Sequence, residues 1–270
     1  MKEYDFYIVP TPIGNLGDIT IRAIEILKSV DLIACEDMRV TQKLLNHFDI
    51  KTKCISYHKF NEKERVDFFL KILKEGEKIA LVSDAGTPLF CDPGAVIVEE
   101  LRKHNFSVTA LAGANAVATF LSQVPRKGED FTFVGFLPKT KSQIQTIIKK
   151  YKSTEMVFYD SPNRILDTMK IIKETRPNSR VAIGRELTKR FEEIVIDDTE
   201  KVINYFQNNP IKGEIAGLIF RQEENSCEDI DINEKIALLK TKNFKAKEIS
   251  VILSELYKLN KNDVYKRCLT

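Results

Sequence analysis

The sequence lacks the long apolar segment that a membrane-spanning helix requires. It contains no run of eighteen or more apolar residues, and residues 2–5 are charged or polar, so we expect neither a transmembrane helix nor a signal peptide. The five cysteines are scattered without a CxxC pair, which suits neither a zinc site nor a disulfide framework. With 43% hydrophobic residues in a chain of 270, we expect a protein with a sizeable core, located in a reducing cytoplasm and without contact to membranes.

The signatures of several enzyme classes are also absent. The sequence has neither the GxxxxGK[ST] loop nor the GxGxxG fingerprint. It therefore lacks the motifs that usually indicate ATP hydrolysis or NAD-dependent hydride transfer. It has no nucleophile elbow, and only three histidines. No cluster has the spacing of metal ligands, so we expect no metal.

Short apolar runs alternate with helical patterns, which predicts an α/β fold. The strands expected in the first half are 6–9, 32–35, 54–56, 79–82 and 108–111. They are apolar on both faces, as buried parallel strands are. After a polar turn at 125–130, a second series of strands is expected at 131–136, 156–159, 181–184, 192–196 and 215–220, the fourth of these as a hairpin strand. Thr199 is expected to cap a helix over 199–207.

These patterns predict two α/β domains and a tail. The first domain covers 1–124 with a parallel sheet, the second covers 125–222 with a mixed sheet, and a basic helical tail covers 231–270, behind an acidic tether at 222–229. The tail holds nine Lys/Arg and five Asp/Glu, a net charge of +4, whereas the remaining 230 residues carry a net charge of −1. This asymmetry hints at a nucleic-acid partner, although a solvated basic helix face explains it equally well.

Three loops rich in glycine and other small residues follow strands of the first series. They are residues 11–18, residues 83–88 with 91–94 behind them, and residues 112–116. Open α/β sheets bind ligands at the carboxyl ends of their strands, and small residues let a ligand approach the backbone. Each loop alone is explained by chain reversal, but three at one sheet edge predict a binding site. Asp84 adds an acceptor suited to an ammonium or a hydroxyl group.

Other strand ends carry acids, bases and cations. These are residues 36–39, 56–62, 159–164 and 185–189. A helix cap or a surface ion pair explains each of them singly. Jointly they predict a cleft lined with charged groups, at the edge where the small-residue loops also emerge.

Several strings together resemble a known family. VPTPIGNLGDIT, SYH followed by NE, LVSDAGTP with DPG, YDSPNR and GRELTKRFEE stand in order between Tyr7 and Phe220. They resemble the ribosomal RNA small-subunit cytidine 2′-O-methyltransferases, which belong to the tetrapyrrole-methylase-like, or class III, methyltransferases. The sequence departs from this pattern at Met38, where relatives usually have Thr, and at 112–116, which reads AGANA in place of PGPSA.

The resemblance implies two α/β domains with S-adenosylmethionine in the cleft between them, no metal, and a homodimer. It implies transfer of the donor's methyl group to the ribose 2′-hydroxyl of a cytidine in the 16S ribosomal RNA of the small subunit. The donor contacts that it implies are Pro10, Ser83, Asp84, Ala85, Gly86, Thr87, Gly113, Ala114, Asn115, Ala116 and Tyr159.

This reaction requires an aligned hydroxyl group, and a general base accelerates it. The candidates for the base, or for orienting the ribose, are Asp37, Glu36 and His58, with Lys189 as an electrostatic stabiliser. The candidates for RNA contacts are Arg39, Arg164, Arg185, Lys245 and Lys247. Two alternatives stay open: methylation of a tetrapyrrole or a diphthine-type acceptor, and a non-catalytic rRNA-binding assembly factor.

Overall fold

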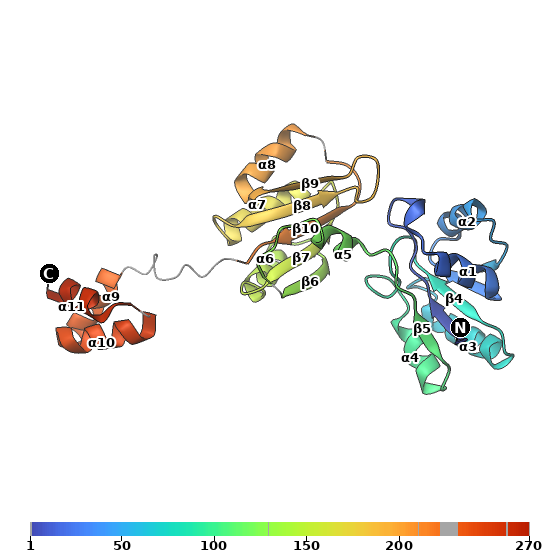
Figure 1. Cartoon of the computed structure of the whole chain (residues 1–270), viewed down its shortest axis with the longest axis horizontal. Helices are drawn as coiled ribbons and strands as arrows, with labels where there is room; N and C mark the ends of the chain where they lie inside the picture. Colours follow the sequence, from blue (N-terminus) through green and yellow to red (C-terminus); the bar gives the residue numbers. More distant parts are fainter. Residues whose placement is uncertain (1, 129, 210, 222–231, 258, 270) are drawn as a thin grey trace. The chain divides into compact units, whose positions relative to one another are not determined.

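The computed structural model describes residues 2–128, 130–209, 211–221, 232–257 and 259–269. The expected acidic tether at 222–229 and the first and last residues expected for the tail, 231 and 270, lie outside these ranges. The chain divides into two compact units, Met1–Arg221 and Gln222–Thr270. Figure 1 labels the elements of each unit.

The first sheet is parallel, as predicted, with the strand order β3-β2-β4-β1-β5. Its strands are β1 (Phe6–Ile8), β2 (Leu32–Cys35), β3 (Lys53–Ser56), β4 (Ile79–Val82) and β5 (Val108–Ala110), each bound within one residue of its prediction. The helices between them are α1 (Ile21–Ser29), α2 (Met38–His47), α3 (Glu62–Lys74) and α4 (Ala95–Lys103). A short 3-10 helix, η1 (Leu16–Asp18), follows β1.

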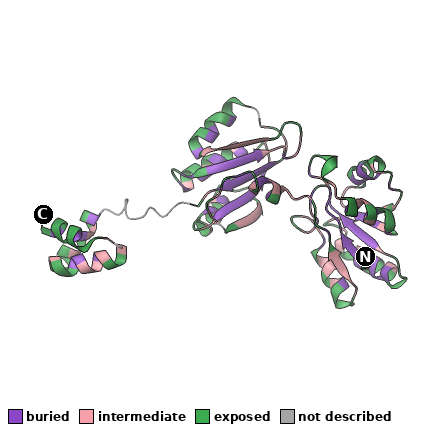
Figure 2. Ribbon diagram, in the orientation of Figure 1, coloured by how far each residue is buried: buried purple, intermediate pink, exposed green. Residues whose placement is uncertain are grey.

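Helices cover both faces of this sheet because successive strand residues point to opposite sides. Phe6 packs in the cluster that contains Phe69 of α3, whereas its neighbour Tyr7 packs in the cluster that contains Leu27 of α1. Figure 2 shows the central strands β1, β2 and β4 largely as buried ribbons. The parallel arrangement brings the carboxyl ends of all five strands to one edge of the sheet.

The second sheet is mixed, as predicted, with the strand order β6-β7-β10-β8-β9. Its strands are β6 (Phe131–Phe136), β7 (Glu155–Asp160), β8 (Arg180–Arg185), β9 (Glu193–Asp198) and β10 (Ile215–Ile219). β6 and β7 are parallel, while β10 runs antiparallel to both of its neighbours and β9 forms the expected antiparallel pair with β8.

The two faces of the second sheet are covered differently. α6 (Lys141–Lys150), α7 (Ile165–Thr175) and α8 (Thr199–Asn208) pack on one face. The short helix α5 (Ala116–Leu121) packs on the other, where Val117 and Phe120 share a core with strand residues such as Ala182. α5 precedes residue 124, so the sequence placed it in the first domain, but its apolar side chains belong to the core of the second sheet.

The prediction that Thr199 caps α8 is wrong. Asp198 occupies the cap position, and Thr199 is the first helical residue. The buried Thr199 hydroxyl donates to the carbonyl oxygen of Ser179 at 2.7 Å and lies 2.8 Å from the Ser179 hydroxyl. Because a buried hydroxyl needs a partner, Thr199 serves to tie α8 to the residue that precedes β8.

The tail forms a helical unit with its own core. α9 (Ile232–Thr241), α10 (Ala246–Tyr257) and α11 (Lys261–Leu269) lie at the predicted places and bury Ile236, Ile249 and Val264 among them. Lys245 and Lys247, at the start of α10, are exposed. Of the helices that the structure describes, none is long and apolar enough to cross a membrane.

Candidate functional site

Hydrogen bonds tie the three small-residue loops of the first sheet to one another. Thr11 and Gly86 exchange backbone hydrogen bonds, each amide donating to the other's carbonyl oxygen at 2.9 Å. The Thr11 hydroxyl donates to the carbonyl oxygen of Ser83 at 3.0 Å, and the Thr87 hydroxyl donates to that of Ala114 at 2.9 Å. The ends of β1, β4 and β5 therefore form one connected edge.

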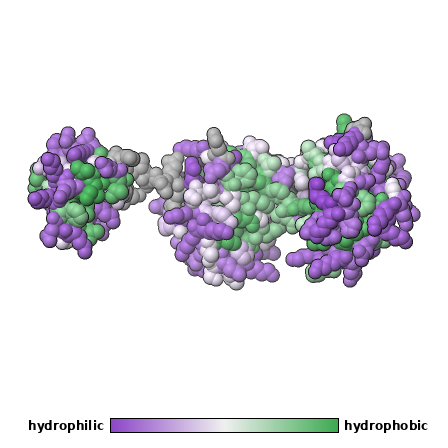
Figure 3. Space-filling model, turned by 90° about the horizontal axis from the view of Figure 1, so that it is seen from below, coloured by the Kyte–Doolittle hydropathy of each residue, from purple (hydrophilic) through white to green (hydrophobic). Residues whose placement is uncertain are grey.

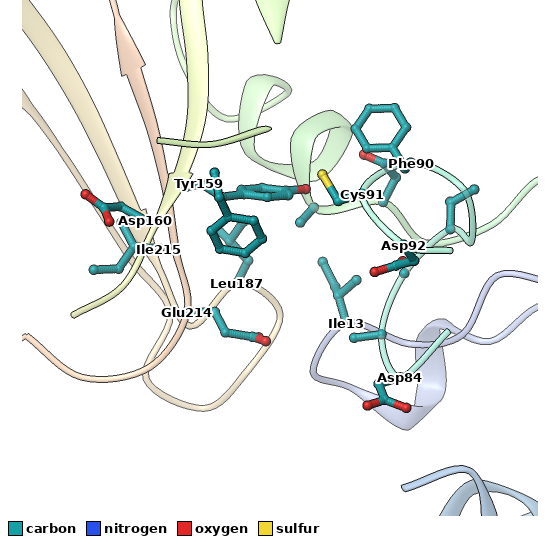
Figure 4. Close-up of a pocket in the computed structure, with 17 residues that line it drawn as sticks. Ile13, Asp84, Phe90, Cys91, Asp92, Tyr159, Asp160, Leu187, Glu214 and Ile215 are labelled. Atoms are coloured by element: carbon teal, nitrogen blue, oxygen red, sulfur yellow. The ribbon is translucent and has the colours of Figure 1, made fainter. Parts of the chain in front are cut away.

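This edge forms one side of a cavity of about 250 Å³, and the second α/β domain forms the other side. Figure 4 shows Tyr159 and Glu214 on one side of the cavity and Ile13, Asp84 and Asp92 on the other. The predicted donor contacts that line the cavity are Asp84, Ala85, Gly86, Thr87, Asn115, Ala116 and Tyr159.

The other predicted donor contacts do not line this cavity. Pro10 and Gly113 pack against each other so closely that a Cβ atom on Gly113 would lie 2.6 Å from the Cβ atom of Pro10. Ala114 accepts the hydrogen bond from Thr87, and the buried Ser83 lines a second cavity nearby. Asn115 lines the first cavity but also caps α5, because its side-chain oxygen accepts the amides of Val117 and Ala118. These residues give the edge its shape.

The sequence analysis did not single out several residues that line the cavity. They are Phe90, Phe136, Glu214, Ile215 and Ala216. Three of them begin or precede β10, whose amino end lies at this edge because it runs antiparallel to β7 and β8. Searching the carboxyl ends of strands misses such a strand. Phe136 could have been found from the sequence, because it is an aromatic residue at the end of a predicted strand. In the structure its side chain is 68% exposed.

The carboxyl groups of Glu36 and Asp92 lie close enough to Asp84 for its charge to affect their pKa values. Burial raises the pKa of Glu36, and the charges of Asp84 and Asp92 raise it further. Burial and Asp84 likewise raise the pKa of Asp92, although a hydrogen bond from Ser83 opposes them. A cation bound beside these groups would relieve their repulsion. The described residues include no group of three His, Cys, Asp or Glu side chains placed to hold a metal ion.

Asp37, the first candidate for the base, is engaged by Arg39. Its carboxylate caps α2 by accepting the Arg39 amide at 2.8 Å and pairs with the Arg39 guanidinium at 2.8 Å. These hydrogen bonds lower the pKa of Asp37 to about 2. A carboxylate with so low a pKa is a weak base near neutral pH, so the geometry suits Asp37 to orientation better than to proton removal.

His58 and Lys189 lie on two further loops. The Nδ1 atom of His58 accepts the amide of Phe60 at 3.3 Å, within the turn that follows β3. Lys189 pairs with Glu186 at 2.9 Å and with Glu214 at 3.3 Å. Burial acts to lower the pKa of Lys189, but its hydrogen bonds and charge pairs with the two glutamates raise it overall.

The loop that carries Lys189 lies directly against the first loop. A Cβ atom on Gly14 would lie 2.5 Å from the Cγ atom of Lys189 and 2.8 Å from the carbonyl oxygen of Leu187. Glycine is therefore required at position 14 for the two loops to approach this closely. The contact joins the β1 end of the first sheet to the β8 end of the second.

Two of the predicted RNA-binding arginines make ion pairs within the second domain. An Nη2 atom of Arg164 pairs with the buried Asp160 at 3.0 Å and donates to the carbonyl oxygen of Leu137 at 3.0 Å. The Nε atom of Arg185 donates to Glu193 across the β8–β9 pair at 2.5 Å. Both arginines thus have structural partners. Arg39 pairs with Asp37, but its side chain is 89% exposed.

Comparison with known proteins agrees with this architecture. Residues 5–203 match the family model described as Tetrapyrrole (Corrin/Porphyrin) Methylases. The chain is 36% identical to the Ribosomal RNA small subunit methyltransferase I of Rickettsia prowazekii, over 97% of this chain and 92% of the relative. It is 40% identical to the protein of the same name from Vibrio cholerae, over 96% of this chain and 92% of the relative.

Solved structures show the same fold at low sequence identity. A cobalt precorrin-4 methyltransferase of cobalamin biosynthesis matches with a TM-score of 0.59 and 16% identity, over 80% of this chain and 94% of that chain. A diphthine synthase matches with a TM-score of 0.64 and 11% identity, over 80% of this chain and 89% of that chain. The chain is thus an enzyme with the predicted two-domain methylase fold, and it belongs to the Tetrapyrrole (Corrin/Porphyrin) Methylases family.

Proposed function

We propose that the protein transfers a methyl group from S-adenosylmethionine to the ribose 2′-hydroxyl of a cytidine in 16S ribosomal RNA. The observation that carries the proposal is the cavity between the small-residue loops and Tyr159, with carboxylates on its first-domain side. It occurs in a chain whose near full-length relatives are named Ribosomal RNA small subunit methyltransferase I.

The cavity suits the donor, which supplies a methyl group activated on a positively charged sulfonium and also carries an ammonium group. Asp84, Asp92 and Glu214 all line the cavity and offer negative charge to such a cation. The small side chains of residues 85–86 leave their backbone groups within a ligand's reach. Tyr159 adds an aromatic surface that packs on Phe133 and Phe136, with ring centroids 5.0 and 5.4 Å apart.

Glu36 is the stronger candidate for the general base. Its raised pKa lies nearer to neutral pH than that of Asp37, which Arg39 holds at about 2. An efficient base has a pKa close to the working pH, because it must be both deprotonated and able to take a proton. In this assignment Asp37 orients the start of α2, and Lys189 keeps a positive charge near the cavity through Glu214.

The names of the relatives with similar sequences favour ribosomal RNA over the other acceptors. The relatives named for ribosomal RNA are 36% and 40% identical to this chain, whereas the precorrin and diphthine enzymes are 16% and 11% identical and share only the fold. The basic tail has a use in RNA binding, because phosphate contacts need exposed lysines such as Lys245 and Lys247. The cavity and its carboxylates would have no use in a non-catalytic assembly factor.

A homodimer also forms part of this proposal. α5 is six residues long, and the face of the second sheet on which it packs keeps Phe133, Ile194, Ile196 and Phe220 only partly buried. Figure 3 shows apolar side chains gathered on one side of the second α/β domain. Pairing with a second copy would remove such a surface from water.

Methyl transfer from labelled S-adenosylmethionine to small ribosomal subunits that lack the modification tests the function. We expect one labelled cytidine per subunit, resistant to alkaline cleavage on its 3′ side because the 2′-hydroxyl is blocked. Label in uroporphyrinogen or in a translation factor instead would contradict the choice of acceptor. Failure to bind the donor at all would contradict the enzyme's mechanism.

Replacing Asp84 with asparagine should weaken donor binding. The change keeps the shape that accepts the Asp37 amide at 3.0 Å but removes the negative charge. Loss of a charge-assisted interaction predicts about a tenfold weaker affinity in calorimetry. S-adenosylhomocysteine lacks the sulfonium charge, so its affinity should fall less. Asp67→Asn, on the exposed side of α3, is the matched control, and equal donor affinity in both variants would remove Asp84 from the donor site.

The pH dependence of methyl transfer separates Glu36 from Asp37. A general base works when deprotonated, so the single-turnover rate should fall as the pH drops through the pKa of Glu36, which lies above its ordinary 4.5. Glu36→Gln should lose roughly 10²–10⁴-fold in rate, together with this acid limb. Asp37→Asn should lose less and keep the limb. The reverse pattern would assign the base to Asp37.

Removing the tail tests its part in RNA binding. A chain that ends at Arg221 keeps the first compact unit whole, so its donor affinity should be unchanged. Its binding to small subunits should weaken, and the slope of log affinity against log salt should flatten by about 0.7–0.9 for each phosphate that the tail neutralises. Lys245→Glu with Lys247→Glu tests the charge in the full chain. The same affinity and slope in all three proteins would show that the tail does not bind RNA.

A further inference from the structure

A second cavity, of about 300 Å³, lies on the other side of the loop that follows β1. Its walls come from that loop, from α2 and from the end of β4. Ile13 lines the first cavity, whereas Pro12 and Leu16 of the same loop line the second one. Asp84 lines both cavities, so the two spaces meet at its side chain.

The residues at this junction are held in place from two directions. The reciprocal hydrogen bonds between Thr11 and Gly86 fix the loop that separates the cavities. The amide of Asp37 donates to the Asp84 carboxylate at 3.0 Å, which attaches the start of α2 to the same point. Glu36 immediately precedes this amide. Asp84 lies where the two cavities meet, and the Glu36 carboxyl group, which lines neither cavity, lies close enough for the charge of Asp84 to raise its pKa.

The walls of the second cavity combine apolar surface with the positive charge of a lysine. Leu16 on the wall formed by the β1 loop and Val40 on the α2 wall are 41% and 40% exposed, so both present apolar surface that a ligand in the cavity could cover. Apolar side chains on two walls of a cavity suit the faces of a flat ring held between them. Lys43, on the α2 wall, makes no ion pair with any of the described residues, so its charge is available to a phosphate.

We propose that this second cavity holds the base of the acceptor nucleotide, turned out of single-stranded RNA, with its ribose at Asp84 and Glu36. The inference rests on the proposed function and extends it to the second substrate. Leu16 and Val40 flank the base, and Lys43 contacts a neighbouring phosphate. Sequence-specific RNA recognition commonly uses unstacked bases held in this way.

The relation of the two cavities also fits the chemistry of the transfer. The nucleophilic oxygen must approach the methyl group from the side opposite the leaving sulfur, in line with the bond that breaks. The 2′-oxygen forms a bond to the methyl carbon, the carbon–sulfur bond breaks with its electron pair going to sulfur, and the hydroxyl proton goes to Glu36. Two substrates that enter separate cavities and meet at Asp84 satisfy this requirement.

A side chain that fills the second cavity tests the proposal. Val40→Trp extends from a part-exposed position on α2 into the cavity, and Gln42→Trp, on the same helix but outside the cavity lining, is the matched control. With small subunits as substrate, Val40→Trp should lose about tenfold or more in kcat/KM, the size expected when base stacking is lost. Donor affinity, measured by calorimetry, should stay unchanged, and Gln42→Trp should behave as the wild type.

Two further variants decide the outcome if Val40→Trp fails to fold. Leu16→Trp fills the cavity from the opposite wall and should show the same selective loss. Lys43→Gln should weaken subunit binding and reduce the salt slope by about one, as expected for one phosphate contact. Wild-type activity in the folded tryptophan variants, or an equal loss in Gln42→Trp, would overturn the cavity assignment. Absence of transfer by the wild type would instead overturn the proposed function.

Discussion

The two reciprocal hydrogen bonds between Thr11 and Gly86 are the interaction on which both cavities depend. They join the end of β1 to the loop after the neighbouring strand β4. The chain between Thr11 and Leu16 is thereby held between the two cavities and separates them. The contact requires β1 and β4 to be parallel, because the carboxyl ends of two neighbouring strands lie at the same edge of a sheet only when the strands are parallel. The small residues of these loops allow the backbones to come within hydrogen-bonding distance.

Some carboxyl groups around this loop are paired with a cation, and others are not. Asp37 has its own cation in Arg39, and Asp160 has Arg164. Glu36 and Asp92 instead have raised pKa values, with burial as the first cause and neighbouring carboxylates adding to it. A protein can keep such groups together at low cost when a positively charged ligand completes the site. The carboxyl groups with raised pKa values therefore belong to the part of the edge that we propose binds the donor.

The sequence predicted the strands well because their apolar runs are bounded by turn residues, and the first sheet's strands fall within one residue of their predicted places. It could not predict which side chains pair with each other, since periodicity says nothing about partners. Arg164 and Arg185 follow strands just as ligand-binding residues do, but each pairs with a carboxylate of its own domain. Glu214 was missed because β10 is antiparallel, a property that depends on how distant strands pair. Thr199 has the composition of a cap, but its hydroxyl bonds to Ser179.

The position of α5 has a consequence for how such proteins can be recombined. Asn115 and Ala116 line the cavity, while Val117 and Phe120, on the same short helix, are packed into the core of the second sheet. A natural or engineered exchange of second domains between relatives would have to place its junction before α5. A junction at residue 124 would pack α5 of one protein against the second sheet of the other. It would also displace part of the cavity wall. The segment that must be exchanged together with the second sheet therefore begins at residues that line the cavity.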